Sequence, residues 1–180
     1  MTSGAHRGAP AEGVPLTVEA INDARGIGPY ARYGMAKLAS LAFGRELGLR
    51  HPRLASSSVH PGVVATDLLR IDNFQAMLGK TIGSIAFRAA RLRNALFAFS
   101  VQEAALTVLY CATSPELSPT STAPRGARDA RIFVPVAAPV QARHAKASDA
   151  EFAKQLWSFS QGLIETALKS AASEAYAAKA

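Results

Sequence analysis

The stretch that decides the fold is Pro29-Tyr30-Ala31-Arg32-Tyr33-Gly34-Met35-Ala36-Lys37-Leu38, followed further on by Ser58-Val59-His60-Pro61-Gly62. Proline suits the first turn of a helix, and apolar residues then recur at Met35, Leu38 and Leu41 with helical spacing. The pattern predicts a helix over 29–49, stopped by the prolyl bond after His51. Residues 54–59 favour a short strand that ends at the Pro-Gly turn. A helix that leads into such a strand is typical of an α/β domain.

The helix carries a chemical signal in Tyr33 and Lys37. Residues four apart lie on one face of a helix, so the phenol and the ammonium project together. A neighbouring cation favours the phenolate form of a tyrosine, which suits proton exchange with a carbonyl or an alcohol. A surface pair at this spacing also arises by chance, so the surrounding motifs are needed to tell a catalytic pair from a fortuitous one.

Polar and turn-forming residues stand on either side of this helix. Ligands of open α/β sheets bind beyond the carboxyl ends of the strands, and Pro61, Gly62 and Thr66 follow a predicted strand directly. Upstream, the hydroxyl of Ser3 could polarise a substrate oxygen. In isolation an ordinary strand-ending turn and a loop serine would explain both features. The histidines show no metal-ligand spacing, so we expect no metal site.

The rest of the chain is mainly helical. Residues 74–99 predict one or two helices, and Ser100 with Glu103 forms a capping box that opens a helix to about Cys111. Residues 132–134 predict a second short strand. A second capping box, Ser148 with Glu151, is expected to open the last helix, and 3–28 and 114–130 are expected to be loops.

Length and composition limit the class of protein. The 180 residues suit one globular domain, and the net charge of +7 is spread along the chain except for a cluster at 88–93. We therefore expect a solvated basic surface and no nucleic-acid binding. The single cysteine excludes an internal disulfide. With neither a long apolar stretch nor a signal peptide in evidence, we expect a cytoplasmic protein.

Four motifs follow one another in the chain: Ser3, Ala5-His6, Tyr33 with Lys37, and Ser58-Val59-His60-Pro61-Gly62. Their order resembles that of the short-chain dehydrogenase/reductase family. The subgroup is similar to retinol-dehydrogenase-like and WW-domain-oxidoreductase-like reductases. The resemblance extends through Gln102-Glu103-Ala104 to Leu156-Trp157-Ser158, nearly the whole chain. It implies a Rossmann-type doubly wound parallel sheet, present here in part.

The resemblance also assigns roles to individual residues. Tyr33 would be the acid/base, Lys37 would assist it and bind the nicotinamide ribose, and Ser3 would orient the substrate oxygen. The nicotinamide end of the cofactor would be lined by Pro61, Gly62, Val64 and Thr66. The implied cofactor is NADP or NAD, and the implied substrate is a small carbonyl compound or alcohol. A possible homo-oligomer would pack through the helix that carries Tyr33 and Lys37.

The glycine-rich turn that the family places well before the serine has no match here. The motif order therefore predicts that residues 1–170 form the C-terminal catalytic half of a dehydrogenase domain without its N-terminal strands, and that 171–180 form a tail. We expect this chain alone to bind no dinucleotide and to turn nothing over. One alternative is a non-catalytic relative that acts as an interaction subunit. Another is a membrane-surface module built on the basic amphipathic residues 77–99; a border of the substrate pocket is favoured there, so membrane contact is not expected.

Overall fold

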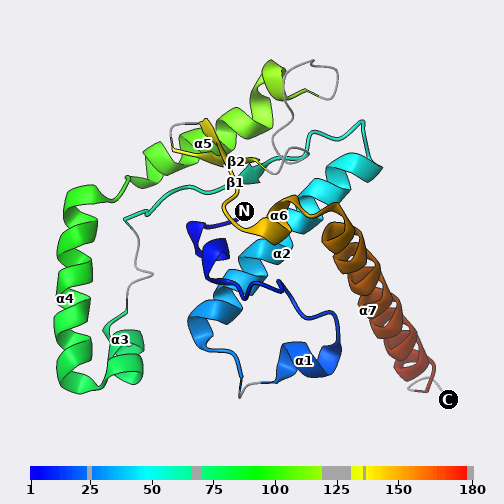
Figure 1. Cartoon of the computed structure of the whole chain (residues 1–180), viewed down its shortest axis with the longest axis horizontal. Coiled ribbons are helices and arrows are strands. Elements are labelled where there is room, and N and C mark those ends of the chain that lie inside the picture. The colour runs from blue at the N-terminus through cyan, green and yellow to red at the C-terminus, as the bar shows by residue number, and fades with distance from the viewer. Residues whose placement is uncertain (24–25, 66–69, 119–130, 136, 178–180) are drawn as a thin grey trace.

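The fold is organised around one long helix, α2 (Pro29–Arg50). A computed structural model describes residues 1–23, 26–65, 70–118, 131–135 and 137–177 (Figure 1). The core lies where α2 meets β2 (Arg131–Val134), α6 (Ala145–Ser148) and α7 (Ala150–Ala177). Its buried members are Leu38, Leu41, Ala42, Ile132, Ala142, Ala147, Phe152, Ala153 and Leu156. The helix predicted over 29–49 is thus confirmed, and its apolar face is the one that is buried.

The N-terminal half of α2 packs closely against the short 3-10 helix η1 (Gly4–Gly8). Gly34 makes this approach possible, because a Cβ atom there would lie 2.7 Å from the backbone nitrogen of Ala9 and 2.8 Å from the carbonyl oxygen of Ala5. Residues 3–28 were expected to be a loop, but the structure forms η1 and the short helix α1 (Val18–Asn22) within them. The hydroxyl groups of Ser3 and Thr17 cap these two short helices.

The sheet is small and mixed. Strand β1 (Ser58–Val59) pairs in parallel with β2, and β2 pairs antiparallel with β3 (Ala138–Gln141), so the order is β1-β2-β3. The molecule is therefore a helix-rich α/β protein, and the expected all-parallel arrangement holds only for β1 and β2. The strand predicted over 54–59 shrinks to its last two residues. Strand β3 was not predicted, since Pro139 argues against a strand; it is accommodated at the sheet edge, where a missing N–H costs no ladder bond.

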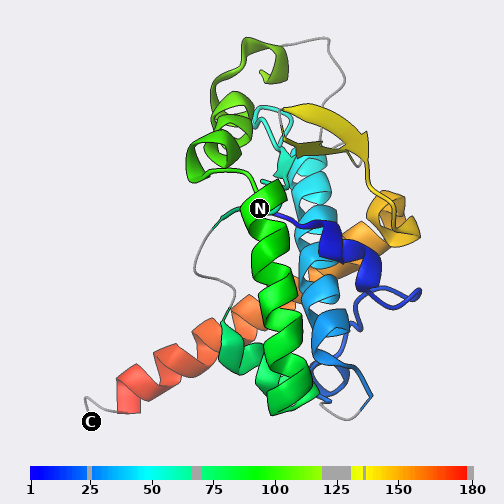
Figure 2. The ribbon, with the colours of Figure 1, turned by 90° about the vertical axis from the view of Figure 1, so that its left-hand side faces the viewer.

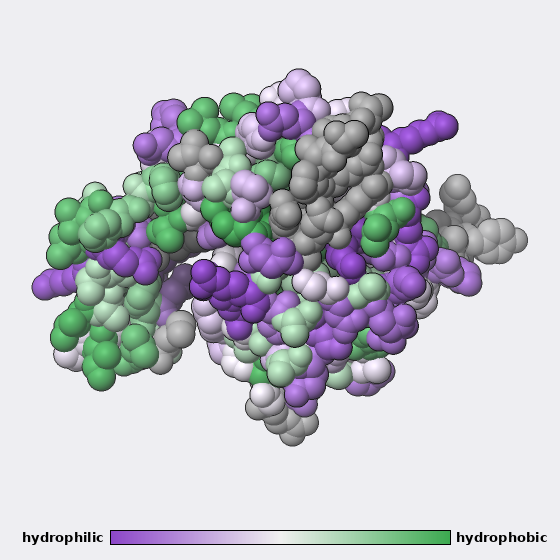
Figure 3. Space-filling model, turned by 45° about the horizontal axis from the view of Figure 1, so that its top comes forward, coloured by the Kyte–Doolittle hydropathy of each residue, from purple (hydrophilic) through white to green (hydrophobic). Residues whose placement is uncertain are grey.

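Helices α3 (Ile71–Leu78) and α4 (Lys80–Phe97) form a hairpin that stands to one side of the molecule (Figures 1 and 2). They cross closely at Gly83, where a Cβ atom would overlap the carbonyl oxygen of Phe74. The rings of Phe74 and Phe87 meet edge to face with centroids 5.8 Å apart. The prediction of one or two helices over 74–99 is confirmed as two. In the space-filling view, apolar residues gather on this hairpin (Figure 3).

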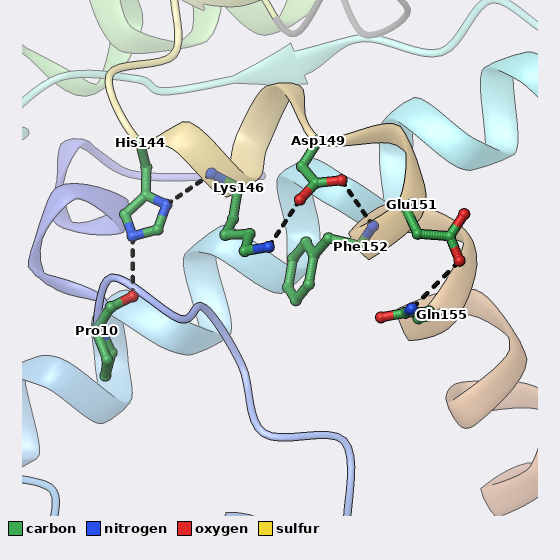
Figure 4. Close-up of polar contacts among 7 residues, drawn as sticks. All are labelled: Pro10, His144, Lys146, Asp149, Glu151, Phe152 and Gln155. Carbon is green, nitrogen blue, oxygen red and sulfur yellow. Dashed lines mark hydrogen bonds and ion pairs between the residues drawn. The ribbon is translucent and has the colours of Figure 1, made fainter.

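Two further helices end the fold. The capping box predicted for α5 (Val101–Thr113) is confirmed, because the Ser100 hydroxyl accepts from the Glu103 amide and the Glu103 carboxylate accepts from the Ser100 amide. The predicted cap of the last helix was wrong by one residue. Asp149 accepts from the backbone of Phe152 at 3.0 Å, whereas Ser148 belongs to α6 (Figure 4). An ionised carboxylate is the stronger acceptor at this helix end.

The residues directly after α5 and the C-terminal part of α7 are also helical. A 3-10 turn, η2 (Pro115–Leu117), follows α5 in the segment expected to be a loop. Helix α7 continues to Ala177 and projects away from the core in both ribbon views. Among the helices that the structure describes, none is both long and apolar enough to cross a membrane.

Candidate functional site

The phenol of Tyr33 and the ammonium of Lys37 lie on one face of α2, as the spacing predicts. The Lys37 Nζ atom is 5.4 Å from the centroid of the Tyr33 ring, and Tyr33 is 47% exposed. In the part of the chain that the structure describes, neither the Tyr33 hydroxyl nor the Lys37 ammonium is engaged in a hydrogen bond or an ion pair. The pair is therefore accessible, and no neighbouring side chain competes with a ligand for it.

The first three residues lie beside the sheet. The backbone N–H of Thr2 donates to the carbonyl of Val59 at 2.8 Å, and the Thr2 hydroxyl donates to the carbonyl of Lys37 at 3.1 Å. Thr2 thus connects the edge of β1 to the helix turn that carries Lys37. Ser3 follows it, and the Ser3 hydroxyl accepts from the Ala5 amide at 3.2 Å. The hydroxyl hydrogen of Ser3 stays available to donate to a substrate oxygen.

The turn after β1 is held by packing. Gly62 has φ of 83°, and a Cβ atom there would lie 2.8 Å from the ring of Phe99 and 2.8 Å from Pro135. Val64 forms an isolated parallel bridge with Phe99, which brings the segment between β1 and α3 against the residues that follow α4. Pro61, Gly62 and Val64 therefore lie beyond the carboxyl end of β1, where they were expected. Thr66 lies outside the described residues.

His6 has a structural role in the fold. His6 is buried, its Nδ1 lies 2.7 Å from the carbonyl of Ser3, and its Nε2 accepts from the backbone N–H of Arg143 at 3.3 Å. Since a backbone N–H can only donate, Nε2 is unprotonated and Nδ1 carries the hydrogen. His6 therefore ties η1 to the segment after β3 in its neutral form.

Burial lowers the pKa of both His6 and His60, with the Arg7 guanidinium acting in the same direction on each. The Nδ1 of His60 is buried, and none of the described residues gives it a hydrogen bond. Together with Gly4, Arg7 and Arg143, these two imidazoles line a cavity of about 210 Å³. No sequence signal marked this cavity, because His6 and Arg143 meet only through the tertiary fold.

A larger cavity of about 500 Å³ lies along α2. Its lining includes Ser40, Phe43 and Gly44 of α2 together with Ser57 and Leu156, and none of its lining residues has an ionisable side chain. Because its lining has no ionisable side chain, this hollow is poorly suited to acid–base chemistry by side chains and better suited to packing. Among the described residues, no group of three or more His, Cys, Asp or Glu is arranged to hold a metal ion.

The residues expected to hold a nicotinamide cofactor are only partly suited to it. Tyr33 is exposed, and among the described residues neither its hydroxyl nor the Lys37 ammonium has a hydrogen-bond or ion-pair partner, as ribose binding and proton exchange would require. The side of Gly62 where a Cβ atom would stand is instead filled by Phe99 and Pro135. This glycine is accounted for by packing, and nothing in its surroundings requires a bound ring.

The comparison with known proteins gives a partial similarity to an oxidoreductase. The chain is 33% identical over 97 residues to a protein of Schizosaccharomyces pombe described as an uncharacterized oxidoreductase. The match covers 51% of this chain and 25% of the relative, so the chain spans about a quarter of that protein's length. No protein-family model and no solved structure matches the chain. The similarity supports an oxidoreductase ancestry for the matched part of the chain.

Proposed function

We propose that this chain carries the acid–base part of an NAD(P)-dependent oxidoreductase of the short-chain dehydrogenase/reductase type, acting on a carbonyl compound or an alcohol. The observation that carries the proposal is the exposed Tyr33 with the Lys37 ammonium 5.4 Å from its ring centroid. The partial similarity to an oxidoreductase supports the same class of chemistry.

In this proposal each residue acts through one polar side-chain atom. The Tyr33 hydroxyl gives a proton to the substrate oxygen in reduction and takes it back in oxidation. The Lys37 ammonium stabilises the phenolate that forms and would bind the nicotinamide ribose. Ser3 donates its free hydroxyl hydrogen to the same substrate oxygen. When bound, the nicotinamide would supply or accept the hydride.

The same proposal extends to the fold. We infer that the three strands are one side of a larger, Rossmann-type doubly wound sheet. The supporting observation is the hydrogen bond from the Thr2 amide to the Val59 carbonyl, which is the kind of contact that a further strand next to β1 would make. Dinucleotide binding by this chain alone is not part of the proposal.

The test is reduction of a panel of carbonyl compounds with NADPH and with NADH. It is run on this chain and on a form that includes any coding sequence upstream of Met1. Tyr33→Phe removes the hydroxyl, and Tyr30→Phe is the matched control: Tyr30 is 63% exposed on the same helix and has Gly34, not a lysine, four residues later. Loss confined to Tyr33→Phe supports the proposal.

A second candidate, an interaction subunit without catalysis, is favoured by the cavity of about 500 Å³ that runs along α2 without an ionisable side chain. A second copy packed through α2 would cover it. Sedimentation velocity separates the two cases. A dimer lost on Ser40→Trp, together with absence of turnover in every form, would favour the interaction subunit.

A further inference from the structure

Helix α4 carries an apolar line of residues that nothing in the described structure covers. Residues 82, 85, 89, 92 and 96 alternate in steps of three and four, which aligns them along one side of a helix. We call Ile82, Ile85, Ala89, Leu92 and Leu96 the α4 seam. Its four large side chains are 64%, 65%, 63% and 66% exposed in chain order. The lobe formed by α3 and α4 is rich in apolar surface in Figure 3.

The seam takes no part in the contact between α3 and α4. α4 turns Gly83 and Phe87 toward α3, where Gly83 nearly touches the backbone of Phe74 and the two phenylalanine rings meet. The seam lies on a different side of the helix, about half a turn away at 100° per residue. The packing of α4 against α3 therefore does not bury the seam, which stays open to a binding partner.

The seam is narrow and regular, which suits another helix as its occupant. Its spacing corresponds to positions a and d of a heptad repeat over two heptads, about 21 Å of helix. Side chains in such a line insert between those of a facing helix. A helix that lies in a membrane interface instead presents a broad apolar face.

Basic residues flank the seam on both sides. In the heptad frame Arg88 occupies position g and Arg93 position e, next to the a and d line. In the described part of the chain neither arginine makes an ion pair. All charged residues of α4 are basic: Lys80, Arg88, Arg91 and Arg93.

These flanks argue against a second copy of α4 as the occupant. In a parallel pair, position g of one helix faces position e of the next heptad on the other, so Arg88 would face Arg93 of the second copy. In an antiparallel pair position g faces g and position e faces e, so Arg88 would meet its own equivalent in one register and Arg93 in another. The parallel pair and these two antiparallel registers place like charges together, whereas glutamate or aspartate at the flanks of a partner helix would pair with them.

We propose that the α4 seam binds an amphipathic helix of a partner protein, with apolar residues at its a and d positions and acidic residues at its e and g positions. The proposal does not depend on the reaction proposed for Tyr33. The apolar line supplies the buried contact, and the two arginines select the charge of the partner.

The test measures fluorescence anisotropy of two labelled helical peptides of three heptads against the full chain. The peptides share leucine and isoleucine at a and d and differ only at e and g, which are glutamate in one and lysine in the other. The acidic peptide is expected to bind at least about tenfold more tightly than the basic one. Ile85→Ser and Leu92→Ser are expected to weaken it by about tenfold or more.

Charge reversal gives the sharpest result, because it produces a gain of binding that misfolding cannot imitate. Arg88→Glu with Arg93→Glu is expected to bind the basic peptide in preference to the acidic one. Arg91→Glu is the matched control: it makes the same charge change on α4, but Arg91 lies off the seam, 6.0 Å from the Phe87 ring. It is expected to keep the original preference.

Three outcomes would overturn the proposal. One is equal binding of both peptides, or of neither. Another is binding to phosphatidylserine vesicles through the seam without binding of the acidic peptide, which would assign the seam to a membrane. The third is self-association of the chain that Leu92→Ser abolishes, which would assign it to a second copy.

Discussion

His6 is buried and His60 is partly buried, and both imidazoles line the cavity of about 210 Å³. Burial lowers the pKa of each below the ordinary value of 6.5, with Arg7 contributing. In the unfolded chain both regain that ordinary value, so below it the unfolded state binds more protons than the folded state. The contribution of the neutral rings to stability is therefore complete above pH 6.5 and is lost as the pH falls from there toward their lowered pKa values.

We expect the free energy of unfolding, measured by urea denaturation, to decrease as the pH is lowered from 7.5 to 5.5. The double variant His6→Gln with His60→Gln is expected to flatten this part of the profile. His51→Gln, at an exposed histidine, is the control and is expected to leave it unchanged. A wild-type profile that is flat, or that rises toward acid, would contradict the assignment of neutral buried rings.

Burial also disfavours the charged form of Cys111, whose thiolate is a nucleophile. Burial raises the pKa of its thiol from 9.0 to about 11, although Ser57 acts in the opposite direction. Below pH 9 the thiolate population is then about 100-fold lower than for a free thiol, and the thiolate is the reactive form. We expect a disulfide reagent such as DTNB to react with the native chain about 100-fold more slowly than with the urea-unfolded chain. Equal rates would contradict this setting.

Among the helices and strands, those that depend on neighbouring residues were more predictable from the sequence than those that depend on distant residues. Helix α2 and the Ser100–Glu103 cap depend on neighbours within one or two turns, so their patterns were visible in the sequence. Strand β3 depends on pairing with β2 and contains Pro139, so the sequence argued against it. The same division applies to the site. Tyr33 and Lys37 share a helix and were predictable, whereas His6 finds Arg143 across 137 residues.

The close approach of α2 to η1 gives a matched pair of glycine substitutions. Gly34→Ala places a Cβ atom 2.7 Å from the backbone nitrogen of Ala9, so one element must shift, at a cost of about 1–3 kcal/mol. Gly162→Ala, in α7, meets nothing within 4 Å and is expected to stabilise by about 0.5–1 kcal/mol through helix propensity. Thermal unfolding measures both. Changes of the same sign would contradict the packing described at Gly34.

At the scale of the whole molecule, the described chain divides into a packed part and an open part. The packed part is α2 with α6, α7 and the sheet, and it presents Tyr33 and Lys37 at its surface. The open part is the α3–α4 hairpin, whose principal contacts are internal and whose apolar seam faces outward. This division separates the two proposals physically: the acid–base pair belongs to the packed part, and partner binding belongs to the hairpin.

We propose Tyr33 as the acid–base group of an oxidoreductase. The most direct test of this role compares Tyr33→Phe with Tyr30→Phe in carbonyl reduction with NADPH and NADH, in the form that includes any coding sequence upstream of Met1. We predict that kcat falls by about 100-fold or more for Tyr33→Phe, because a general acid contributes about 10²–10⁴-fold, and that Tyr30→Phe stays near the parent rate. Equal activity of the two variants, or no turnover by a folded parent, would contradict the claim.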